Sequence, residues 1–278
     1  MILVTGATGN VGRHVLARLG AEGPAGVRAL VRPGAAHPRA GVDVVTGSLD
    51  HPEGLDAALT GVRTVFLVWP FLTTDGAPAV LEAIARRARR VVYLSSTGVG
   101  GPEEPTDPVF TLHAEMERRI EASGLQPTVL RADTIASNTL AWAEQIRGTG
   151  VVRGPLTAAT AVVDPRDIAA VAARALTDDA HVGATHVLTG PEVISRPEQV
   201  DAIGAAIGRE LRFEEVKVPD ARAQLLADGR PPALVDALLS AAENRVASTL
   251  VTPTVEDVTG KPARSFPRWA HDHRDAFR

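Results

Sequence analysis

Residues 1–32 read MILVTGATGNVGRHVLARLGAEGPAGVRALVR, and this stretch decides the fold. An apolar strand over Ile2–Thr5 leads into a turn, a helix with one apolar face over Val11–Leu19, and a second strand over Val27–Val31 that ends beside Arg32. The turn carries three glycines, each three residues apart: Gly6, Gly9 and Gly12. Strand, glycine turn, helix and strand in this order are typical of a dinucleotide-binding unit.

Each glycine of the turn has a separate physical role in such a unit. The first permits a tight turn, the second lets the backbone approach a pyrophosphate, and the third lets the helix pack closely on the sheet. Free N–H groups and the positive end of the helix dipole then face the phosphates. A turn that serves packing alone is the alternative. We expect dinucleotide contacts from Gly6, Thr8, Gly9, Asn10, Val11 and Gly12.

Arg32 stands where a dinucleotide site selects its cofactor. NAD sites carry Asp or Glu here, about 20 residues beyond the turn, to bind the ribose 2′-hydroxyl. A guanidinium instead binds a 2′-phosphate, often through two parallel hydrogen bonds. Arg13 could approach the same phosphate, although both arginines could also be ordinary exposed residues. The sequence therefore favours NADP(H) over NAD(H).

Strands and helices alternate as far as Arg131, which predicts a Rossmann-type α/β fold, a doubly wound parallel sheet with helices on both faces. We expect a dinucleotide-binding core over 1–150, to which 162–190 return, and a smaller, mostly helical substrate-side part over 191–278. The tail from Val251 shows little periodicity, so we expect it to wrap the surface or be mobile. Expected strands are 42–46, 64–68, 91–95, 128–131, 151–152, 186–188 and 212–218; expected helices are 52–59, 78–89, 110–122, 139–147, 165–176, 197–207 and segments within 220–245.

Composition excludes several classes of protein. The 278 residues are 45% hydrophobic and 22% charged, as in soluble globular domains, and a net charge of −4 argues against a nucleic-acid surface. The arginines at 86, 87, 89 and 90 are interpreted as cations at a helix end, with anion binding as the alternative. The chain has no cysteine and no apolar run of about 18 residues, and its first strand begins at Ile2. We expect a cytoplasmic monomer or homodimer with a small-molecule substrate and no metal, nucleic-acid or membrane partner.

Several motifs together resemble the NmrA-like group of atypical short-chain dehydrogenases/reductases over roughly residues 1–215. They are 5–12 (TGATGNVG), 29–32 (ALVR), 93–96 (YLSS) and 164–169 (DPRDIA). Within the group the chain looks nearest to NADPH-dependent quinone reductases and to reductases of the ergot-alkaloid type. The resemblance implies further cofactor contacts at Ser48, Leu49, Leu67, Val68 and Trp69, with Ser48 replacing an aspartate that usually helps hold adenine. It implies a substrate pocket lined by Trp69, Phe71, His113, Asn138 and Trp142, with core packing or helix capping as the alternatives.

Members of the wider superfamily use a Tyr-x-x-x-Lys pair, which this chain lacks, because Tyr93 is its single tyrosine and its lysines come late. His113 and Glu117 stand in the place of the pair, four residues apart on one helix face. A histidine can donate a proton near neutral pH, and a nearby carboxylate would raise its pKa. Ser95 ends a strand at the ligand-facing edge and could hold a carbonyl oxygen or the nicotinamide ribose. We expect His113, Ser95 and Glu117 to be catalytic, or alternatively a pocket-lining histidine and a surface glutamate.

The absence of the Tyr-x-x-x-Lys pair limits which reactions we expect. Reduction of an ordinary ketone needs a positioned proton donor at the oxygen, whereas a quinone, imine or iminium is already electron-poor. The sequence therefore favours an NADPH-dependent oxidoreductase that transfers hydride to a small conjugated acceptor of this type. An NADP-sensing regulatory protein without turnover is the main alternative, and epimerase or isomerase chemistry on a nucleotide sugar is a third.

Overall fold

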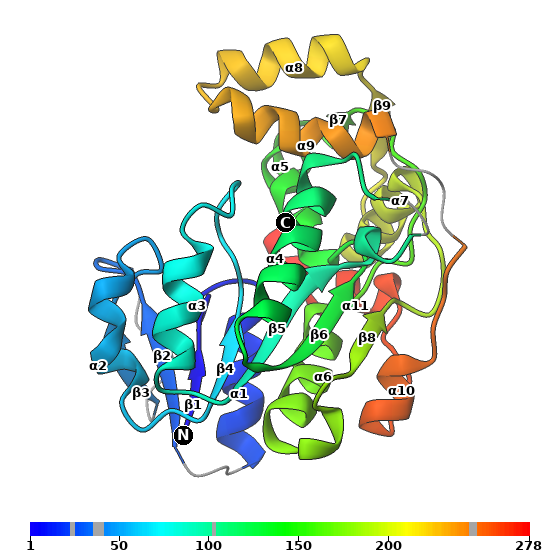
Figure 1. Cartoon of the computed structure of the whole chain (residues 1–278). Helices are drawn as coiled ribbons and strands as arrows, with labels where there is room; N and C mark the ends of the chain where they lie inside the picture. Colours follow the sequence, from blue (N-terminus) through cyan, green and yellow to red (C-terminus); the bar gives the residue numbers. More distant parts are fainter. Residues whose placement is uncertain (23–25, 36–41, 102–103, 245–248) are drawn as a thin grey trace.

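A parallel sheet of seven strands forms the centre of the molecule, whose computed structural model describes residues 1–22, 26–35, 42–101, 104–244 and 249–278 (Figure 1). The strands are ordered β3-β2-β1-β4-β5-β6-β8, and each neighbouring pair is parallel. Their bounds are β1 Ile2–Val4, β2 Val27–Val31, β3 Asp43–Thr46, β4 Thr64–Leu67, β5 Arg90–Ser96, β6 Gln126–Ala132 and β8 Thr185–Leu188. Because the chain builds outward from β1 in both directions, the predicted doubly wound α/β fold is confirmed.

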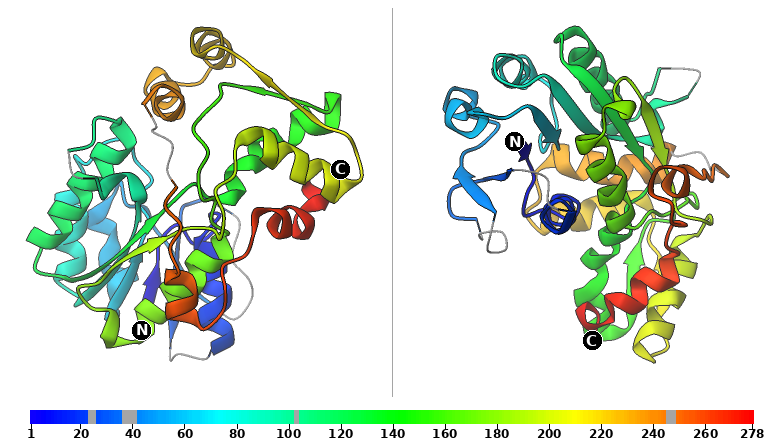
Figure 2. Two further views of the ribbon diagram at one scale, coloured as in Figure 1. Left: turned by 90° about the vertical axis from the view of Figure 1, so that its right-hand side faces the viewer. Right: turned by 90° about the horizontal axis from the view of Figure 1, so that it is seen from below.

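Helices cover both faces of this sheet (Figures 1 and 2). One face is covered by α1 Gly12–Glu22, α6 Pro165–Thr177 and α10 Thr254–Thr259. The other is covered by α2 Leu55–Leu59, α3 Ala77–Ala85 and α4 Pro108–Ala122. Short 3-10 helices occupy Pro52–Gly54, Thr97–Val99, Ala136–Trp142, Asp179–His181 and Arg274–Ala276. None of the described helices is both long and apolar enough to cross a lipid bilayer.

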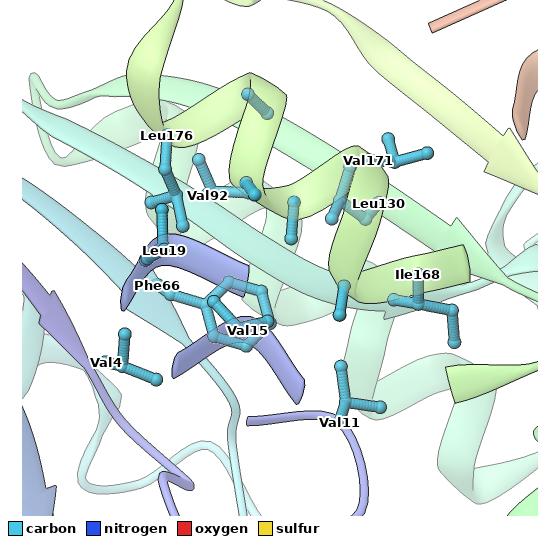
Figure 3. Close-up of a cluster of buried hydrophobic side chains, with 14 of the residues drawn as sticks. Val4, Val11, Val15, Leu19, Phe66, Val92, Leu130, Ile168, Val171 and Leu176 are labelled. Atoms are coloured by element: carbon cyan, nitrogen blue, oxygen red, sulfur yellow. The ribbon is translucent and has the colours of Figure 1, made fainter. Parts of the chain in front are cut away.

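The core follows from the alternation of side chains along each strand, which sends successive residues to opposite faces. Val4, Phe66 and Val92 point to the face of α1 and α6, where they pack against helix residues such as Val15 and Ile168 (Figure 3). Their strand neighbours, among them Leu3, Val65, Val91 and Tyr93, point to the face of α2, α3 and α4. Burial on both faces explains why these strands read as nearly continuous apolar runs.

A second group of elements follows β6. It contains a parallel strand pair, β7 Val151–Gly154 and β9 Arg212–Glu215, and the helices α5 Ala143–Thr149, α7 Arg196–Ile207, α8 Val218–Ala227, α9 Pro232–Asn244 and α11 Phe266–Asp272. Helices α8 and α9 pack on each other through Ala221, Val235 and Leu239. In Figure 1 this helix pair stands above the carboxyl end of the sheet.

The expectation that the tail after Val251 wraps the surface or is mobile is wrong. Phe266, Trp269 and Phe277 are buried in one apolar cluster with residues of α7 and β7, so the tail completes the core of the second group. An ion pair also holds it, because Arg166 of α6 contacts Asp272 of α11 at 2.8 Å. Phe266, Trp269 and Ala270 are spaced three and four residues apart, a helical period that the sequence reasoning missed.

Several helices and strands begin or end at residues other than those predicted. Helix α3 stops at Ala85, four residues early, and β9 stops at Glu215 because α8 begins at Val218. The helix expected over 139–147 is divided into a 3-10 segment and α5. The helical segment that the sequence analysis ended at residue 245 is confirmed as α8 and α9, but Arg245 itself lies outside the described residues.

Candidate active site

The predicted site residues gather at the carboxyl edge of the sheet. The glycine turn follows β1, Arg32 follows β2, Ser48 follows β3, and Val68 follows β4. Ser95 lies in the last two residues of β5. In open parallel sheets, ligands bind outside the carboxyl ends of the strands, where β1 and β4 mark the reversal of strand order. This edge is therefore the candidate active site.

The glycine turn closes on itself. Gly6 adopts φ +58°, a backbone conformation that favours glycine, and the N–H of Gly9 donates to its carbonyl oxygen at 2.9 Å. A Cβ at Gly12 would lie 2.1 Å from that same oxygen, and a Cβ at Gly9 would lie 3.1 Å from it. The third glycine is thus required by the turn itself, rather than only by helix–sheet packing as expected.

This turn fits a dinucleotide diphosphate. Thr8, Gly9 and Asn10 are exposed just before the N-terminus of α1, where unpaired N–H groups and the helix dipole attract anions. The side chain of Val11 is buried in the core, so its contact would be made through its backbone N–H. Thr5, which the sequence analysis overlooked, fixes the turn to β4: its hydroxyl donates to the Phe66 carbonyl at 3.1 Å and accepts from the Val68 N–H at 2.9 Å.

Arg32 is exposed at the end of β2, beside the turn that follows β3. In that turn a hydrogen bond from Ser48 lowers the pKa of the Asp50 carboxyl, and the charge of Arg32 lowers it a little further. Arg13 is exposed in the first turn of α1. The structure thus places a guanidinium at the expected position; its contact with a 2′-phosphate stays a prediction.

Of the cofactor and pocket residues expected after β3 and β4, some are buried in the core and others could line a pocket. Leu49 and Leu67 are buried, so their side chains belong to the core and only their backbones could reach a ligand. Val68 packs against Gly6. Trp69 donates from its indole N–H to the Thr73 carbonyl at 2.8 Å, and its ring meets half-buried Phe71 edge-on with centroids 4.9 Å apart. This aromatic pair can form one wall of a pocket.

Glu117 lies at the centre of a buried polar cluster. The Ser95 hydroxyl donates to its Oε1 at 2.5 Å, and the Arg131 guanidinium donates to both carboxylate oxygens, at 2.6 and 3.1 Å. Glu117 is only 6% exposed, so its interpretation as a surface residue is wrong. Arg131 neutralises this buried charge, and the hydrogen bond to Glu117 raises the pKa of Arg131. One signal in the sequence was missed: Arg131 lies near the carboxyl end of the neighbouring strand, directly opposite Ser95.

His113 contacts a different partner. Its Nδ1 lies 2.7 Å from the hydroxyl of Tyr93, which extends from β5 beneath α4. Burial lowers the pKa of His113 to about 4, and the opposing effect of Glu117 is smaller. Glu117 raises this pKa, as expected of a nearby carboxylate, but burial lowers it by more, so the pKa of His113 falls overall. At neutral pH the ring carries no charge and has no surplus proton to give.

Two of the implied pocket residues lie apart from this cluster. Trp142 packs beside Ile146 in the apolar cluster of the second group, whereas Trp69 and Phe71 belong to the cluster beneath α3 and α4. Asn138 is exposed on the 3-10 segment after β6. The structure therefore brings Ser95, His113 and Glu117 together but does not add Trp142 to the Trp69 wall. Across the described part of the chain, no three His, Asp or Glu side chains are arranged to hold a metal ion.

Comparison with known proteins identifies the family and several relatives of the chain. A model of the NmrA-like family matches residues 1–262. The chain is 43% identical over 281 residues to the (4-alkanoyl-5-oxo-2,5-dihydrofuran-3-yl)methyl phosphate reductase of Streptomyces griseus subsp. griseus, spanning 100% of this chain and 99% of that one. It is 34% identical over 285 residues to the NAD(P)H azoreductase of Xenophilus azovorans, with 100% and 99% covered. Among solved structures, NADPH-dependent quinone oxidoreductase QOR2 of Escherichia coli in complex with NADPH matches with a TM-score of 0.80 and 24% identity, over 98% of this chain and 99% of that one.

Proposed function

The chain belongs to the NmrA-like family, as its motifs suggested, and we propose that it is an NADPH-dependent reductase of a small, conjugated, electron-poor acceptor. Reductase activity is supported by the relatives, which are named for the reduction of a furanone phosphate and of azo compounds. The observation that carries the proposal is the carboxyl edge itself. It combines a diphosphate cradle with a polar cluster in which His113 is neutral and the Glu117 carboxylate is paired with Arg131.

The cofactor would be held by the backbone of the glycine turn, with Arg32 at the 2′-phosphate. Replacing the usual acidic residue by arginine removes a repulsive charge and adds an attractive one. When bound, NADPH supplies a hydride from its nicotinamide ring. Ser95 at the end of β5 would orient the nicotinamide ribose or the acceptor by accepting a hydrogen bond, because its own proton is donated to Glu117.

The acceptor is best matched by a double bond conjugated to a carbonyl. Hydride would add to the far carbon of that double bond, and the electron pair would move to the carbonyl oxygen as an enolate. His113 would stabilise the developing negative charge by a hydrogen bond, and solvent would protonate the carbon next to the carbonyl. The proton and hydride together reduce the double bond, so no acidic side chain is required. Quinones, imines and iminium ions meet the same demand.

The first acceptor to test is an alkanoyl furanone phosphate, because the 43% identical relative is named for it and its ring carbons form such a conjugated system. Purified protein would be mixed with NADPH and, separately, with this compound, with quinones, with azo dyes and with cyclic imines. We expect steady loss of nicotinamide absorbance with at least one acceptor, and loss of that turnover in Ser95→Ala. Tight NADPH binding with no oxidation by any acceptor would refute the reductase and support the nucleotide-sensing alternative.

A further inference from the structure

Tyr93 is the only tyrosine of the chain, and its position beneath α4 is unusual for a polar side chain. Its ring is fully buried in β5, with 0% exposed surface. Its hydroxyl makes one hydrogen bond within the described residues, to Nδ1 of His113 at 2.7 Å. The rings are tilted by 49° with centroids 5.8 Å apart, so they meet through their polar atoms and do not stack.

The direction of this hydrogen bond follows from the burial of the hydroxyl. If Nδ1 were the donor, the Tyr93 proton would be buried with no acceptor in the described part of the chain, and leaving a buried donor unpaired is costly. If the hydroxyl is the donor, its only proton is paired. Burial also raises the pKa of Tyr93, so the hydroxyl keeps the proton that it donates.

A hydroxyl that donates to Nδ1 determines where the imidazole carries its own proton. In neutral histidine one ring nitrogen is a donor and the other an acceptor. Since Nδ1 accepts, the N–H lies on Nε2, which makes no hydrogen bond within the described residues. His113 is half-buried on the same helix as Glu117, and Glu117 bonds Ser95 at the ligand-facing edge.

We infer that Tyr93 is a positioning residue that holds His113 in its Nε2–H form, so that His113 offers a neutral N–H donor to the oxygen of the acceptor. The acceptor part of this inference rests on the proposed function; the tautomer does not. As hydride reaches the far carbon, the electron pair moves to the oxygen, and the hydrogen bond from the Nε2–H group to that oxygen strengthens. The proton stays on Nε2, and solvent protonates the neighbouring carbon.

The tautomer can be observed directly in the full chain. Long-range ¹H–¹⁵N correlation spectra distinguish protonated from unprotonated ring nitrogens, and the signals lost in His113→Asn are those of His113. At pH 7 we expect an unprotonated Nδ1 and a protonated Nε2. In Tyr93→Phe we expect a mixture of both tautomers. Protonation of Nδ1 in the unsubstituted protein, whether alone or together with Nε2, would overturn the inference.

Turnover tests the same residue through another property. Tyr93→Phe should lower kcat about tenfold with little change in KM, because the missing constraint matters most as charge develops on the oxygen. Thr128→Val is the matched control: it also removes a buried hydroxyl, one that donates to the His181 carbonyl at 2.7 Å, near the other end of the sheet. Equal kcat losses in both variants would reduce Tyr93 to a structural role. If no acceptor is reduced at all, the proposed function fails while the spectra still decide the tautomer.

Discussion

The two edges of the central sheet differ in the role of their charged and polar side chains. The amino edge carries a hollow of about 400 Å³ lined by residues that include Arg63, Arg89 and Arg90. Of these arginines, Arg90 serves the fold: it donates to the carbonyls of Ala175 and Asp178 at the end of α6, at 2.6 and 3.0 Å. The carboxyl edge instead holds the glycine turn, the Glu117 cluster and His113.

Chain direction explains this difference. In a parallel sheet the returning helices present their carbonyl ends to the amino edge and their N–H ends to the carboxyl edge. Arg90 therefore satisfies carbonyls of α6, not those of the preceding helix as the basic run suggested, and Arg86 and Arg87 pair with Glu82 and Asp56 instead. Anionic ligands are attracted to the second edge. The comparison predicts that substitutions at the carboxyl edge change binding and turnover, whereas those at the amino edge change stability.

The largest effect is expected from Gly12→Ala. The added Cβ would lie 2.1 Å from the Gly6 carbonyl oxygen, so the phosphate turn must open. We expect NADPH affinity to fall by at least about a thousandfold, or ~4 kcal/mol, in a calorimetric titration. Gly20→Ala is the control on the same helix, where a Cβ meets nothing within 4 Å and should stabilise the protein by about 0.5–1 kcal/mol. A folded Gly12→Ala protein with normal affinity would contradict the role of the turn.

Acidification should destabilise the protein through His113. Its pKa is about 4 in the folded protein against an ordinary 6.5, so between these values the unfolded chain binds the proton more readily. The free energy of unfolding should therefore fall as the pH drops from 6.5 towards 4, by up to about 3 kcal/mol from this residue. Urea titrations across this range should show a shallower fall in His113→Asn, which cannot titrate. His14, whose pKa burial also lowers to about 4, acts in the same direction in both proteins. Parallel pH curves would mean that His113 is not buried in its neutral form.

Arg90→Met tests the amino edge. The variant keeps the apolar stem but removes two charged hydrogen bonds to helix carbonyls, so we expect a loss of about 2 kcal/mol in the free energy of unfolding. NADPH affinity and kcat should stay within twofold of the unsubstituted protein. A fall in kcat without a fall in stability would contradict the claim that the amino edge serves stability alone.

The smallest effect is expected from Arg32→Glu, which changes one exposed charge. We expect NADPH affinity to fall about tenfold, or ~1.4 kcal/mol, while NADH affinity stays the same or improves. Arg118→Ala serves as the control, because it removes an exposed arginine of α4 that pairs with Glu104. Equal losses for both dinucleotides would show that Arg32 does not read the 2′-phosphate.

Local features of the sequence predicted much of the fold and the cofactor edge. The glycine spacing and the arginine after the second strand depend only on neighbours in the chain, and the structure places both as expected. Apolar runs predicted the strands because parallel strands are buried on both faces. The start of α11 also had a local signal that we missed, a capping Ser265 followed within two residues by proline.

Contacts between distant segments could not be predicted in the same way. Whether His113 meets Glu117 or Tyr93 depends on how α4 is rotated against β5, and that rotation is set by packing. The sequence does not show how deeply the His113 ring is buried, and this burial lowers its pKa against the effect of Glu117. Likewise, the packing of Phe266, Trp269 and Phe277 against α7 joins segments that are far apart in the chain, so local periodicity does not reveal it.

The central claim is that the carboxyl edge transfers a hydride from NADPH to a conjugated acceptor. The most direct test is a single turnover with NADPH deuterated at the transferable position of its nicotinamide, followed by mass spectrometry and NMR of the product. We predict one deuterium on the far carbon of the former double bond and a solvent hydrogen on the carbon beside the carbonyl. A reduced product that carries no deuterium would contradict the claim.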